Sequence, residues 1–367
     1  MELVVRKTDL LRELQLFQGI VERKNTIPIL ANVLFDATSS EIRLLATDLE
    51  VALSSRCEGV VSKPGTVTIP AKKLFEIVRA LPDTDIRIVE EKGSVRVSAD
   101  RFDSRIQTLP KDDFPSLPSP ARKEVATLPK DGMKQMVAKT HFAITGEDTR
   151  YFLNGAKFII KPGSLTLVAT DGHRLAHVEV TAPVGVKAEV GVILPKKTLV
   201  ELGRLLSEFD GELTFESGEN HLFFELGGRT LVSRMIDGQF PAYERVIPKG
   251  NDKILEFDRD RLTNAVKRVA LLSNERSRAV KFEVNKGVVD VTSSSSEFGE
   301  AREQLAVDYS DGPLTISFNA QYVLDFLNVV ETEVVSLALK DEVSQAVMRP
   351  VAAEGYNYTY VIMPMRI

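Results

Sequence analysis

The sequence predicts an α+β fold made of three copies of one unit, each with helices packed on one face of antiparallel strands. Three short phrases recur in one order and at nearly one period, which indicates triplication of a whole domain. Within each copy, two segments place apolar residues at helical spacing. Alternating apolar and polar residues, separated by Gly-containing turns, predict the strands between and after them.

The repeated phrases define three domains. The first phrase is residues 44–48, which returns as 167–171 after about 123 residues and, more weakly, as 289–293. The second phrase opens a helical pattern at 69–74, 194–199 and 318–323. The third phrase is Phe-Pro at 114–115 and 240–241, and Met-Pro at 363–364. We therefore expect domains at 1–120, 121–247 and 248–367, named here the first, central and third repeats.

Each repeat is expected to hold two helices. In the first repeat, Thr8 or Asp9 is the predicted N-cap of a helix whose buried face carries Leu10, Leu14 and Phe17. The corresponding first helices carry Met133, Met136 and Val137, and Leu262, Val266 and Val269. The second helices bury Leu74 and Val78, Leu199 and Leu202, and Val323 and Leu327. Turns such as Lys161-Pro162-Gly163 connect the predicted strands.

The bulk composition restricts the class of protein. The chain has 367 residues, 43% of them hydrophobic and 27% charged, which is typical of a globular protein with several cores. No apolar run approaches the roughly 18–20 residues that cross a bilayer, so we expect no membrane association. The single cysteine, Cys57, excludes an intrachain disulfide and fits a cytoplasmic protein. A net charge of −5 argues against tight DNA binding by the whole surface.

No catalytic or metal motif is evident. The nucleotide-binding, dinucleotide-binding, zinc-protease and nucleophile-elbow patterns are all missing from the sequence. His173 and His177 have the spacing of two metal ligands on a helix, but no Cys or carboxylate cluster accompanies them. Asp171 and His173 could form a hydrolase pair, although no nucleophile motif is present. We expect no enzyme activity, no metal and no cofactor.

Basic residues gather on the polar sides of the predicted helices. Three similar domains in a row could form an arc whose helices present these cations to a polyanion. The alternative is that they are ordinary solvated helix faces, which is the commoner fate of exposed Lys and Arg. They are Lys7, Arg12, Lys72, Lys73, Arg79, Lys134, Lys139, Lys196, Lys197, Arg204, Arg259, Arg261, Lys267 and Arg268.

Several segments resemble the bacterial sliding clamp family, the beta subunits of replicative DNA polymerase. The longest are 170–176 (Thr-Asp-Gly-His-Arg-Leu-Ala) and 360–367, and the segments 150–155, 237–241 and 272–275 also match. The resemblance covers the whole chain, including its triplication. It implies a non-catalytic processivity factor, a homodimeric ring of six clamp domains that encircles double-stranded DNA without reading its sequence.

The resemblance also implies a dimer contact between the first repeat of one chain and the third repeat of another. The matching positions are Ile106, Leu271 and Leu272, with Arg96 and Arg105 facing Glu297, Glu300 and Glu303. Ser104 stands where the family has an aromatic residue, which predicts weaker apolar packing. For DNA, the resemblance implies contacts by Lys24, with Arg23 beside it, and by Tyr151 and Phe152. The cations of the helix faces complete the expected DNA-facing residues, with Lys72, Arg79, Lys196 and Lys197. Glu147 and Phe152 depart from some relatives and could reduce phosphate contact.

A pocket for short peptides is the last implication. Its expected partners are the replicative polymerase alpha subunit, the clamp loader delta subunit, translesion polymerases and mismatch-repair proteins. Met, Leu and Pro make an adaptable apolar surface, and Arg174 and Arg366 could hold a partner's carboxylate or carbonyl. The matching residues are Phe152, Leu153, Thr170, Gly172, His173, Arg174, Leu175, Pro241, Arg245, Val246, Val343, Met363, Pro364, Met365 and Arg366.

Two alternatives to a clamp remain open from the residues alone. The pocket residues could simply be the packed join between the central and third repeats, because apolar residues are mostly core. The chain would then be a structural protein that assembles through its repeats. The other alternative is a hydrolase built on Asp171 and His173. A C-terminal tail ending in Met-Pro-Met-Arg-Ile favours a docking surface, because a free tail is usually polar.

Overall fold

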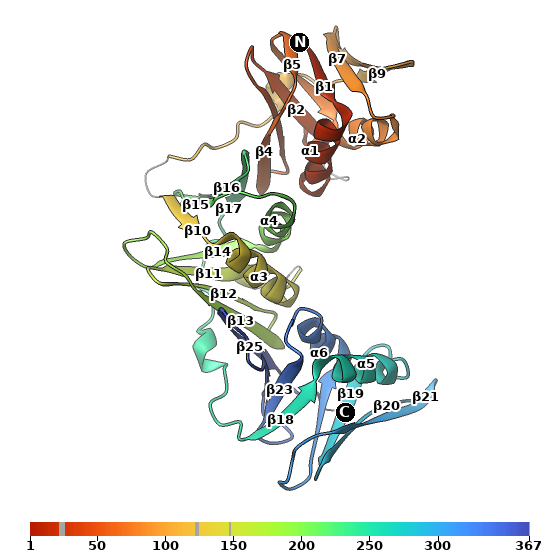
Figure 1. Cartoon of the computed structure of the whole chain (residues 1–367), viewed down its shortest axis with the longest axis vertical. Coiled ribbons are helices and arrows are strands. Elements are labelled where there is room, and N and C mark those ends of the chain that lie inside the picture. The colour runs from red at the N-terminus through yellow and green to blue at the C-terminus, as the bar shows by residue number, and fades with distance from the viewer. Residues whose placement is uncertain (22–25, 122–124, 147, 367) are drawn as a thin grey trace. The chain divides into compact units, whose positions relative to one another are not determined.

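The computed structural model describes residues 1–21, 26–121, 125–146 and 148–366 (Figure 1). The chain divides into two compact units, Met1–Asp131 with Lys197–Met235, and Gly132–Lys196 with Ile236–Ile367. Each unit therefore holds one terminal repeat together with part of the central repeat. The units consist of antiparallel sheets with helices against them, which confirms the predicted α+β class.

The first unit is built on two sheets. The larger runs in the order β10 (Val125–Leu128), β15 (Leu213–Ser217), β16 (His221–Leu226), β17 (Arg229–Arg234), β4 (Val51–Cys57), β3 (Ile42–Thr47), β2 (Asn32–Ala37) and β6 (Gly65–Pro70). It is continuous across two repeats because β17 pairs with β4, with Leu231 opposite Leu53. The smaller sheet runs β5 (Val60–Lys63), β1 (Glu2–Arg6), β7 (Asp85–Glu91), β8 (Ser94–Ala99) and β9 (Phe102–Gln107).

Helices α1 (Lys7–Ile20), α2 (Ala71–Ala80) and most of α4 (Lys196–Glu208) belong to this unit. Helix α1 buries Leu10, Leu14 and Phe17, as the periodicity predicted. The predicted N-cap was wrong, because α1 begins at Lys7 and has no side-chain cap. The backbone N–H of Lys7 donates instead to the carbonyl of Thr84 at 3.0 Å, so the strand runs directly into the helix.

The second unit repeats this plan. Its larger sheet runs β14 (Val190–Pro195), β11 (Gly155–Lys161), β12 (Ser164–Thr170), β13 (Arg174–Thr181), β25 (Tyr356–Ile362), β24 (Ala346–Pro350), β23 (Val334–Leu339) and β18 (Lys253–Asp258). The pairing of β13 with β25, with Leu175 opposite Val361, joins the central and third repeats. The smaller sheet runs β21 (Gly299–Ala306), β20 (Val288–Ser295), β19 (Ala279–Asn285) and β22 (Leu314–Asn319).

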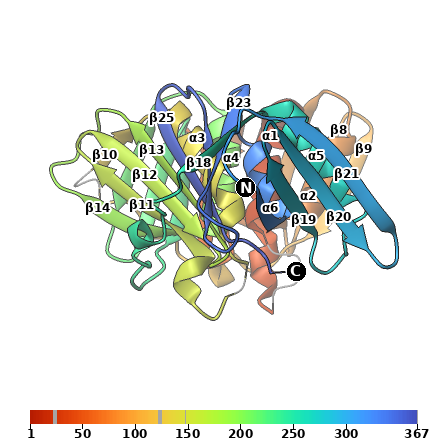
Figure 2. The same cartoon turned by 90° about the horizontal axis from the view of Figure 1, so that it is seen from below.

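Helices cover the sheets of this unit too. They are α3 (Lys130–Thr140, from Gly132 on), α5 (Arg259–Ala270) and α6 (Ala320–Leu327). Helix α5 lies against β20 and β21, as Figure 2 shows, and its apolar face buries Leu262, Val266 and Val269. Short 3₁₀ helices occupy Pro28–Ala31, Lys111–Asp113, His141–Ala143, Tyr151–Asn154 and Tyr243–Arg245. Among the helices of the described residues, none is long and apolar enough to span a membrane.

The strands follow one topology three times. The meanders β2-β3-β4, β11-β12-β13 and β19-β20-β21 occupy equivalent places, as do β7-β8-β9, β15-β16-β17 and β23-β24-β25. At each internal join, the last strand of one meander pairs with the last strand of another. Strand β4 of β2-β3-β4 pairs with β17 of β15-β16-β17, and β13 of β11-β12-β13 pairs with β25 of β23-β24-β25. The equivalent strands β21 and β9 lie at the ends of their own sheets.

Candidate functional site

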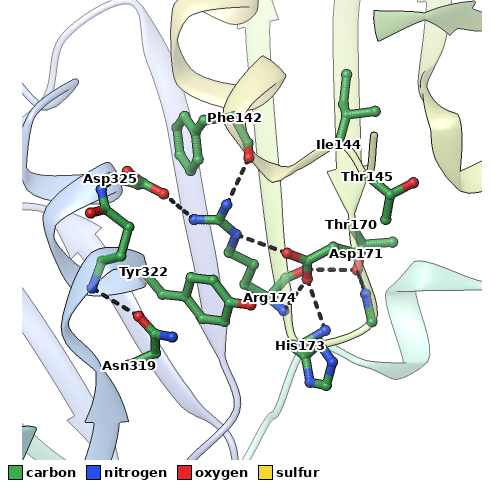
Figure 3. A network of polar contacts seen from close by, with 12 residues as sticks. Phe142, Ile144, Thr145, Thr170, Asp171, His173, Arg174, Asn319, Tyr322 and Asp325 are labelled. Atoms are coloured by element: carbon green, nitrogen blue, oxygen red, sulfur yellow. Dashed lines mark hydrogen bonds and ion pairs between the residues drawn. The ribbon is translucent and has the colours of Figure 1, made fainter. Parts of the chain in front are cut away.

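The turn between β12 and β13 forms one side of the candidate site (Figure 3). Oδ1 of Asp171 accepts the backbone N–H groups of His173 at 2.9 Å and Arg174 at 3.0 Å. The hydroxyl of Thr170 accepts the N–H of Gly172 and donates to the carbonyl of Arg174. Gly172 has a φ of 88°, which glycine adopts without strain. The short polar side chains therefore fix the turn.

Arg174 ties this turn to two other elements of the same unit. Its Nε donates to Oδ2 of Asp171 at 3.0 Å, and its Nη2 donates to the carbonyl of Phe142 at 2.7 Å. Its Nη1 donates to Asp325 on α6 (Figure 3). The guanidinium carbon also lies 4.3 Å from the centre of the Tyr322 ring, a cation–π geometry.

This environment favours the charged form of Arg174. Burial disfavours its charge, but Tyr360, Asp325 and Asp171 outweigh that cost and raise the pKa of the guanidinium above its usual value. The side chain is only 9% exposed, and Nε, Nη1 and Nη2 all have partners within the chain. Arg174 therefore ties the turn to the rest of the site, and its expected contact with a partner's carboxylate or carbonyl stays a prediction.

A cavity of about 180 Å³ lies beside the turn. Its floor belongs to an apolar cluster of Ile159, Val168, Leu175, Tyr243 and Val361. The cavity is lined by Arg150, Leu153, Thr170, Gly172, His173, Arg174, Leu175, Pro241, Tyr243, Val246, Val361 and Met363. It is thus a small apolar hollow with backbone and polar groups at one side, as in sites that bind apolar side chains.

The C-terminal segment after β25 completes the rim. The N–H of Met363 donates to the carbonyl of His173 at 2.9 Å, and the N–H of Met365 donates to the carbonyl of Ser317 at 2.7 Å. These bonds hold the segment in place, yet the side chains of Met363 and Val246 are 42% and 40% exposed. Apolar side chains held at the surface around a hollow are typical of a docking site.

Tyr243 supports the floor from the loop after β17. Burial, followed by the charge of Glu244, raises the pKa of its phenol to about 12, so the ring is neutral. The centre of the Tyr243 ring lies 5.6 Å from that of the His177 ring on β13. The ammonium of Lys157 lies 5.5 Å from the centre of the same Tyr243 ring. Burial lowers the pKa of His177, so this histidine is a packed side chain of the floor.

The structure brings together most of the expected pocket residues. Leu153, Thr170, Gly172, His173, Arg174, Leu175, Pro241, Val246 and Met363 all line the cavity. Phe152, Arg245, Val343, Pro364, Met365 and Arg366 do not line it. Sequence reasoning missed Arg150, Tyr243 and Val361. Arg150 was within a segment already noted, and Tyr243 follows the repeated Phe-Pro phrase, so both carried a usable signal.

The geometry also bears on the alternatives. The carboxylate of Asp171 is engaged by two backbone N–H groups and by Arg174, which leaves it as a turn-forming group. His173 lies in the turn, whereas His177 lies on β13 beside Tyr243. Within the ranges that the structure describes, no group of three or more His, Cys, Asp and Glu side chains could hold a metal.

The expected DNA-facing residues differ in exposure and in their partners. Lys72 and Arg79 are exposed on α2, and Tyr151 is 57% exposed, whereas Arg23 and Lys24 lie outside the described residues. Lys196 and Lys197 are half-buried and their amines are bonded within the chain, so their contact with DNA stays a prediction. Nζ of Lys196 donates to the carbonyl of Ile144 at 2.8 Å, and burial lowers its pKa. Nζ of Lys197 donates to Asp48 and to the carbonyl of Ile20.

Lys139 was expected on a polar helix face, and that expectation was wrong. The residue is 1% exposed, and its ammonium lies 4.7 Å from the centre of the Tyr356 ring. Burial lowers its pKa. The periodicity of α3 did not predict this because β25, from the third repeat, covers that side, with the hydroxyl of Tyr358 donating to the Lys139 carbonyl.

The expected dimer residues lie on or beside the sheets that end in β9 and β21. Ile106 is on β9, and Leu271, just after α5, is 78% exposed. Leu272 follows it, and Glu297 and Glu300 are exposed near the β20–β21 turn. Three of the charged residues already have partners within the chain: Arg96 pairs with Asp103, Arg105 with Glu91, and Glu303 with Arg268. Phe102, Leu109 and Phe298 are exposed apolar residues that were missed.

Three repeats thus share sheets, and an apolar hollow lies where the central and third repeats join. Residues 1–118, 127–242 and 244–366 match the N-terminal, central and C-terminal domains of the DNA polymerase III beta subunit. The chain belongs to the DNA polymerase III beta subunit family, whose curated members are the beta sliding clamps.

Individual relatives are similar over their whole length. The chain is 38% identical over 371 residues to the beta sliding clamp of Pseudomonas aeruginosa, and 37% identical over 372 residues to that of Escherichia coli K12, covering 100% of each chain. A solved structure of the sliding clamp from Pseudomonas aeruginosa bound to griselimycin superposes with a TM-score of 0.93 at 38% identity, again over 100% of both chains.

Proposed function

We propose that this chain is a processivity clamp, which encircles duplex DNA and tethers the replicative polymerase and other replication and repair proteins through the cavity between β13, the β12–β13 turn and the C-terminal segment. The apolar cavity is the observation that carries this proposal. It occurs in a chain whose three repeats all belong to one clamp family. The protein performs no catalysis of its own and acts in the cytoplasm.

The ring follows from the repetition of the joins. Since β4 pairs with β17 and β13 with β25, the equivalent strand β21 should pair with an equivalent of β9. Both strands end their sheets, so the partner for each comes from a second copy of the chain. Two such contacts related by a twofold axis close a homodimer of six domains.

The internal joins also predict the register of this contact. In β8·β9, Ile106 opposes Val95, just as Ser233 opposes Leu222 and Ile362 opposes Ala346. At the internal joins, Ser233 pairs with Val51 and Ile362 pairs with Arg174. Val51 directly precedes Ala52, which lies opposite Thr47, and Arg174 directly precedes Leu175, which lies opposite Thr170. The residue in that place on β21 is Ala301, because Arg302 opposes Thr292. Ile106 of one chain is therefore expected opposite Ala301 of the other.

This register places Ser104 opposite Glu303 of the other chain, so Ser104 adds no apolar contact. Other residues of the two strands supply that contact. It puts Phe102 opposite Leu305, and it carries the β20–β21 turn with Phe298 toward Leu109. Phe102, Leu109 and Phe298 are 39%, 37% and 45% exposed in the single chain. Their burial adds apolar area that the missing aromatic residue does not supply.

DNA contact is proposed to be weak and independent of sequence. Lys72 and Arg79 on α2 remain exposed, with Arg23 and Lys24 as further candidates. A few contacts to phosphates tolerate every base sequence and allow the ring to slide. Retention then comes from topology, which does not need high affinity.

The cavity suits short peptides from many partners. Methionine, leucine, valine and proline side chains adapt to different apolar residues. We infer that the replicative polymerase alpha subunit, the clamp loader delta subunit, translesion polymerases and mismatch-repair proteins compete for it. We also propose domain boundaries at 120/121 and 247/248, because residues 114–121 and 246–252 lie outside the helices and strands.

Retention on DNA tests the proposal. The protein is loaded onto nicked circular DNA with a clamp loader and ATP, and the complex is passed through a sizing column in high salt. We expect the protein to stay on the circle and to be lost once the circle is cut, because only linear DNA lets a ring slide off. Loss from both circular and linear DNA, with a loader shown to load a known clamp, contradicts the proposal.

A further inference from the structure

Asp325 on α6 is not a lining residue of the cavity, yet it is bonded to a residue that is. Its Oδ2 accepts Nη1 of Arg174, and its Oδ1 accepts the side-chain amide of Gln321 at 2.7 Å. The carboxylate is 18% exposed, against 9% for the arginine. Asn319 caps the start of α6 by accepting the N–H of Gln321, so the carboxylate is held by an ordered helix.

Asp325 is linked to the cavity through Arg174. Nε of Arg174 holds Oδ2 of Asp171, whose Oδ1 accepts the N–H groups of His173 and Arg174 (Figure 3). Thr170, Gly172, His173 and Arg174 all contribute to the cavity wall. The orientation of the guanidinium therefore sets where Asp171 lies, and Asp171 sets the shape of the wall.

The other internal join has a tie of the same kind. Asp48, equivalent to Asp171 in the repeated phrase, accepts the N–H groups of Glu50 at 2.9 Å and Val51 at 2.6 Å through Oδ1. Its Oδ2 accepts Nζ of Lys197 on α4, the helix equivalent to α6. In both joins, an ion pair thus links the turn of one repeat to the second helix of the next. The cation is on the helix in the first join (Lys197) and on the turn in the second (Arg174).

We propose that Asp325 is a positioning residue for the docking cavity. By anchoring Arg174 to α6, it holds the Thr170–Arg174 turn in the shape that receives a ligand, and so it determines ligand affinity without touching the ligand. This inference rests on the proposed docking function of the cavity. Loss of the carboxylate leaves Nη1 with only the long 3.5 Å contact to the hydroxyl of Tyr360, while Nε and Nη2 keep Asp171 and the Phe142 carbonyl. The guanidinium then shifts toward those remaining partners and loosens the wall.

Griselimycin is the probe, because a related clamp has been crystallised with it. Calorimetric titration of the full-length protein compares the wild type with Asp325→Asn, which keeps the size of the side chain and removes its charge. We expect roughly tenfold weaker binding, the scale of one charge-assisted hydrogen bond. Asp325→Glu should recover part of the loss, because the carboxylate is restored.

Glu13→Gln is the matched control. It removes the carboxylate of a helix-to-strand ion pair, Glu13 with Arg229, in the compact unit that does not contribute to the cavity. We expect it to lower thermal stability while griselimycin affinity stays within about twofold of the wild type. Equal loss of affinity in both variants would show that the effect is general destabilisation, and it would overturn the proposal.

Two further measurements separate positioning from simple stabilisation. In an Arg174→Met background, Asp325→Asn should have no additional effect on affinity, because the route through the guanidinium is already gone. Hydrogen–deuterium exchange in unliganded Asp325→Asn should rise over residues 170–174. Additive losses in the double variant, or unchanged exchange in this turn, overturn the proposal.

The binding measurements also distinguish failure of the positioning role of Asp325 from failure of the proposed docking function of the cavity. If the wild type does not bind griselimycin, or if Met363→Asp and Tyr243→Ala leave binding unchanged, the docking role of the cavity fails and the inference fails with it. If those two variants weaken binding and Asp325→Asn does not, the docking role stands and the inference alone is overturned.

Discussion

Glu13 on α1 and Arg229 on β17 form a two-pronged ion pair between the first and central repeats. Nε of Arg229 donates to Oε2 of Glu13 at 2.9 Å, and its Nη2 donates to Oε1. The side chains are 1% and 8% exposed, and the guanidinium carbon lies 3.4 Å from the centre of the Phe209 ring. Both charges are thus desolvated, so each depends on the other.

Removing one member of this pair is expected to destabilise the protein strongly. Arg229→Met leaves the buried Glu13 carboxylate with the exposed Arg12, whose Nε lies 3.3 Å from Oε1, as its remaining cationic partner. We expect about 3–5 kcal/mol of unfolding free energy to be lost. The double variant Glu13→Leu, Arg229→Met removes both charges and should recover part of this loss. Chemical denaturation measures both. A single variant as stable as the wild type would show that water reaches the carboxylate.

The dimer contact can be tested at Ile106. Ile106→Asp places a carboxylate on β9, where the proposed register has Ala301 of the other chain, and we expect the protein to become monomeric by light scattering after size exclusion. Ile254→Asp is the control, because Ile254 is 56% exposed on β18, outside the proposed contact. A dimer that survives Ile106→Asp but not Ile254→Asp would place the interface elsewhere.

His177 should make stability fall at mildly acid pH. Its pKa is lowered in the folded protein by burial. The unfolded chain therefore takes up the proton first, and stability that is present above about pH 6.5 is lost as the pH falls toward the folded pKa. We expect the melting temperature to drop between about pH 7.5 and about pH 5.5 by less in His177→Gln than in the wild type. An equal drop in both would assign the acid sensitivity to other groups.

Cys57 should be inert while the protein is folded. Burial, followed by the charges of Glu13 and Asp9, raises the pKa of its thiol to about 12. The thiolate is the reactive form, so alkylation at neutral pH should be slow in the native protein and fast in guanidinium. The same shift means that stability declines as the pH rises from about 9 toward about 12, where only the unfolded thiol ionises. Mass spectrometry follows the alkylation, and rapid native labelling would contradict the expected burial.

The repeated phrases predicted the fold well because they mark structural transitions. Helices α2, α4 and α6 begin at Ala71, Lys196 and Ala320, directly after the Pro or Asn of the second phrase. The start of α1 was missed because its first N–H bonds to Thr84, which is distant in sequence. Short-range patterns carry no information about such a partner.

The site was predicted less completely, and for the same reason. The resemblance identified most cavity residues, but it could not show that Arg174 is engaged by Asp325, 151 positions away. Likewise, the helical pattern placed Lys139 at the surface, although strand β25 from the next repeat buries it. Contacts across a join between repeats determine the environment of Arg174 and of Lys139. The sequence pattern of a single helix or strand carries no information about such contacts.

The sharing of sheets between repeats has a consequence for synthesis on the ribosome. One compact unit is complete once Met235 has emerged, whereas the larger sheet of the other needs β25, from residues 356–362. Strand β13 is therefore translated far ahead of the partner that covers its edge. The nascent chain must carry that open edge until translation is nearly finished, which makes this interval the period of greatest exposure to misassembly and to chaperones.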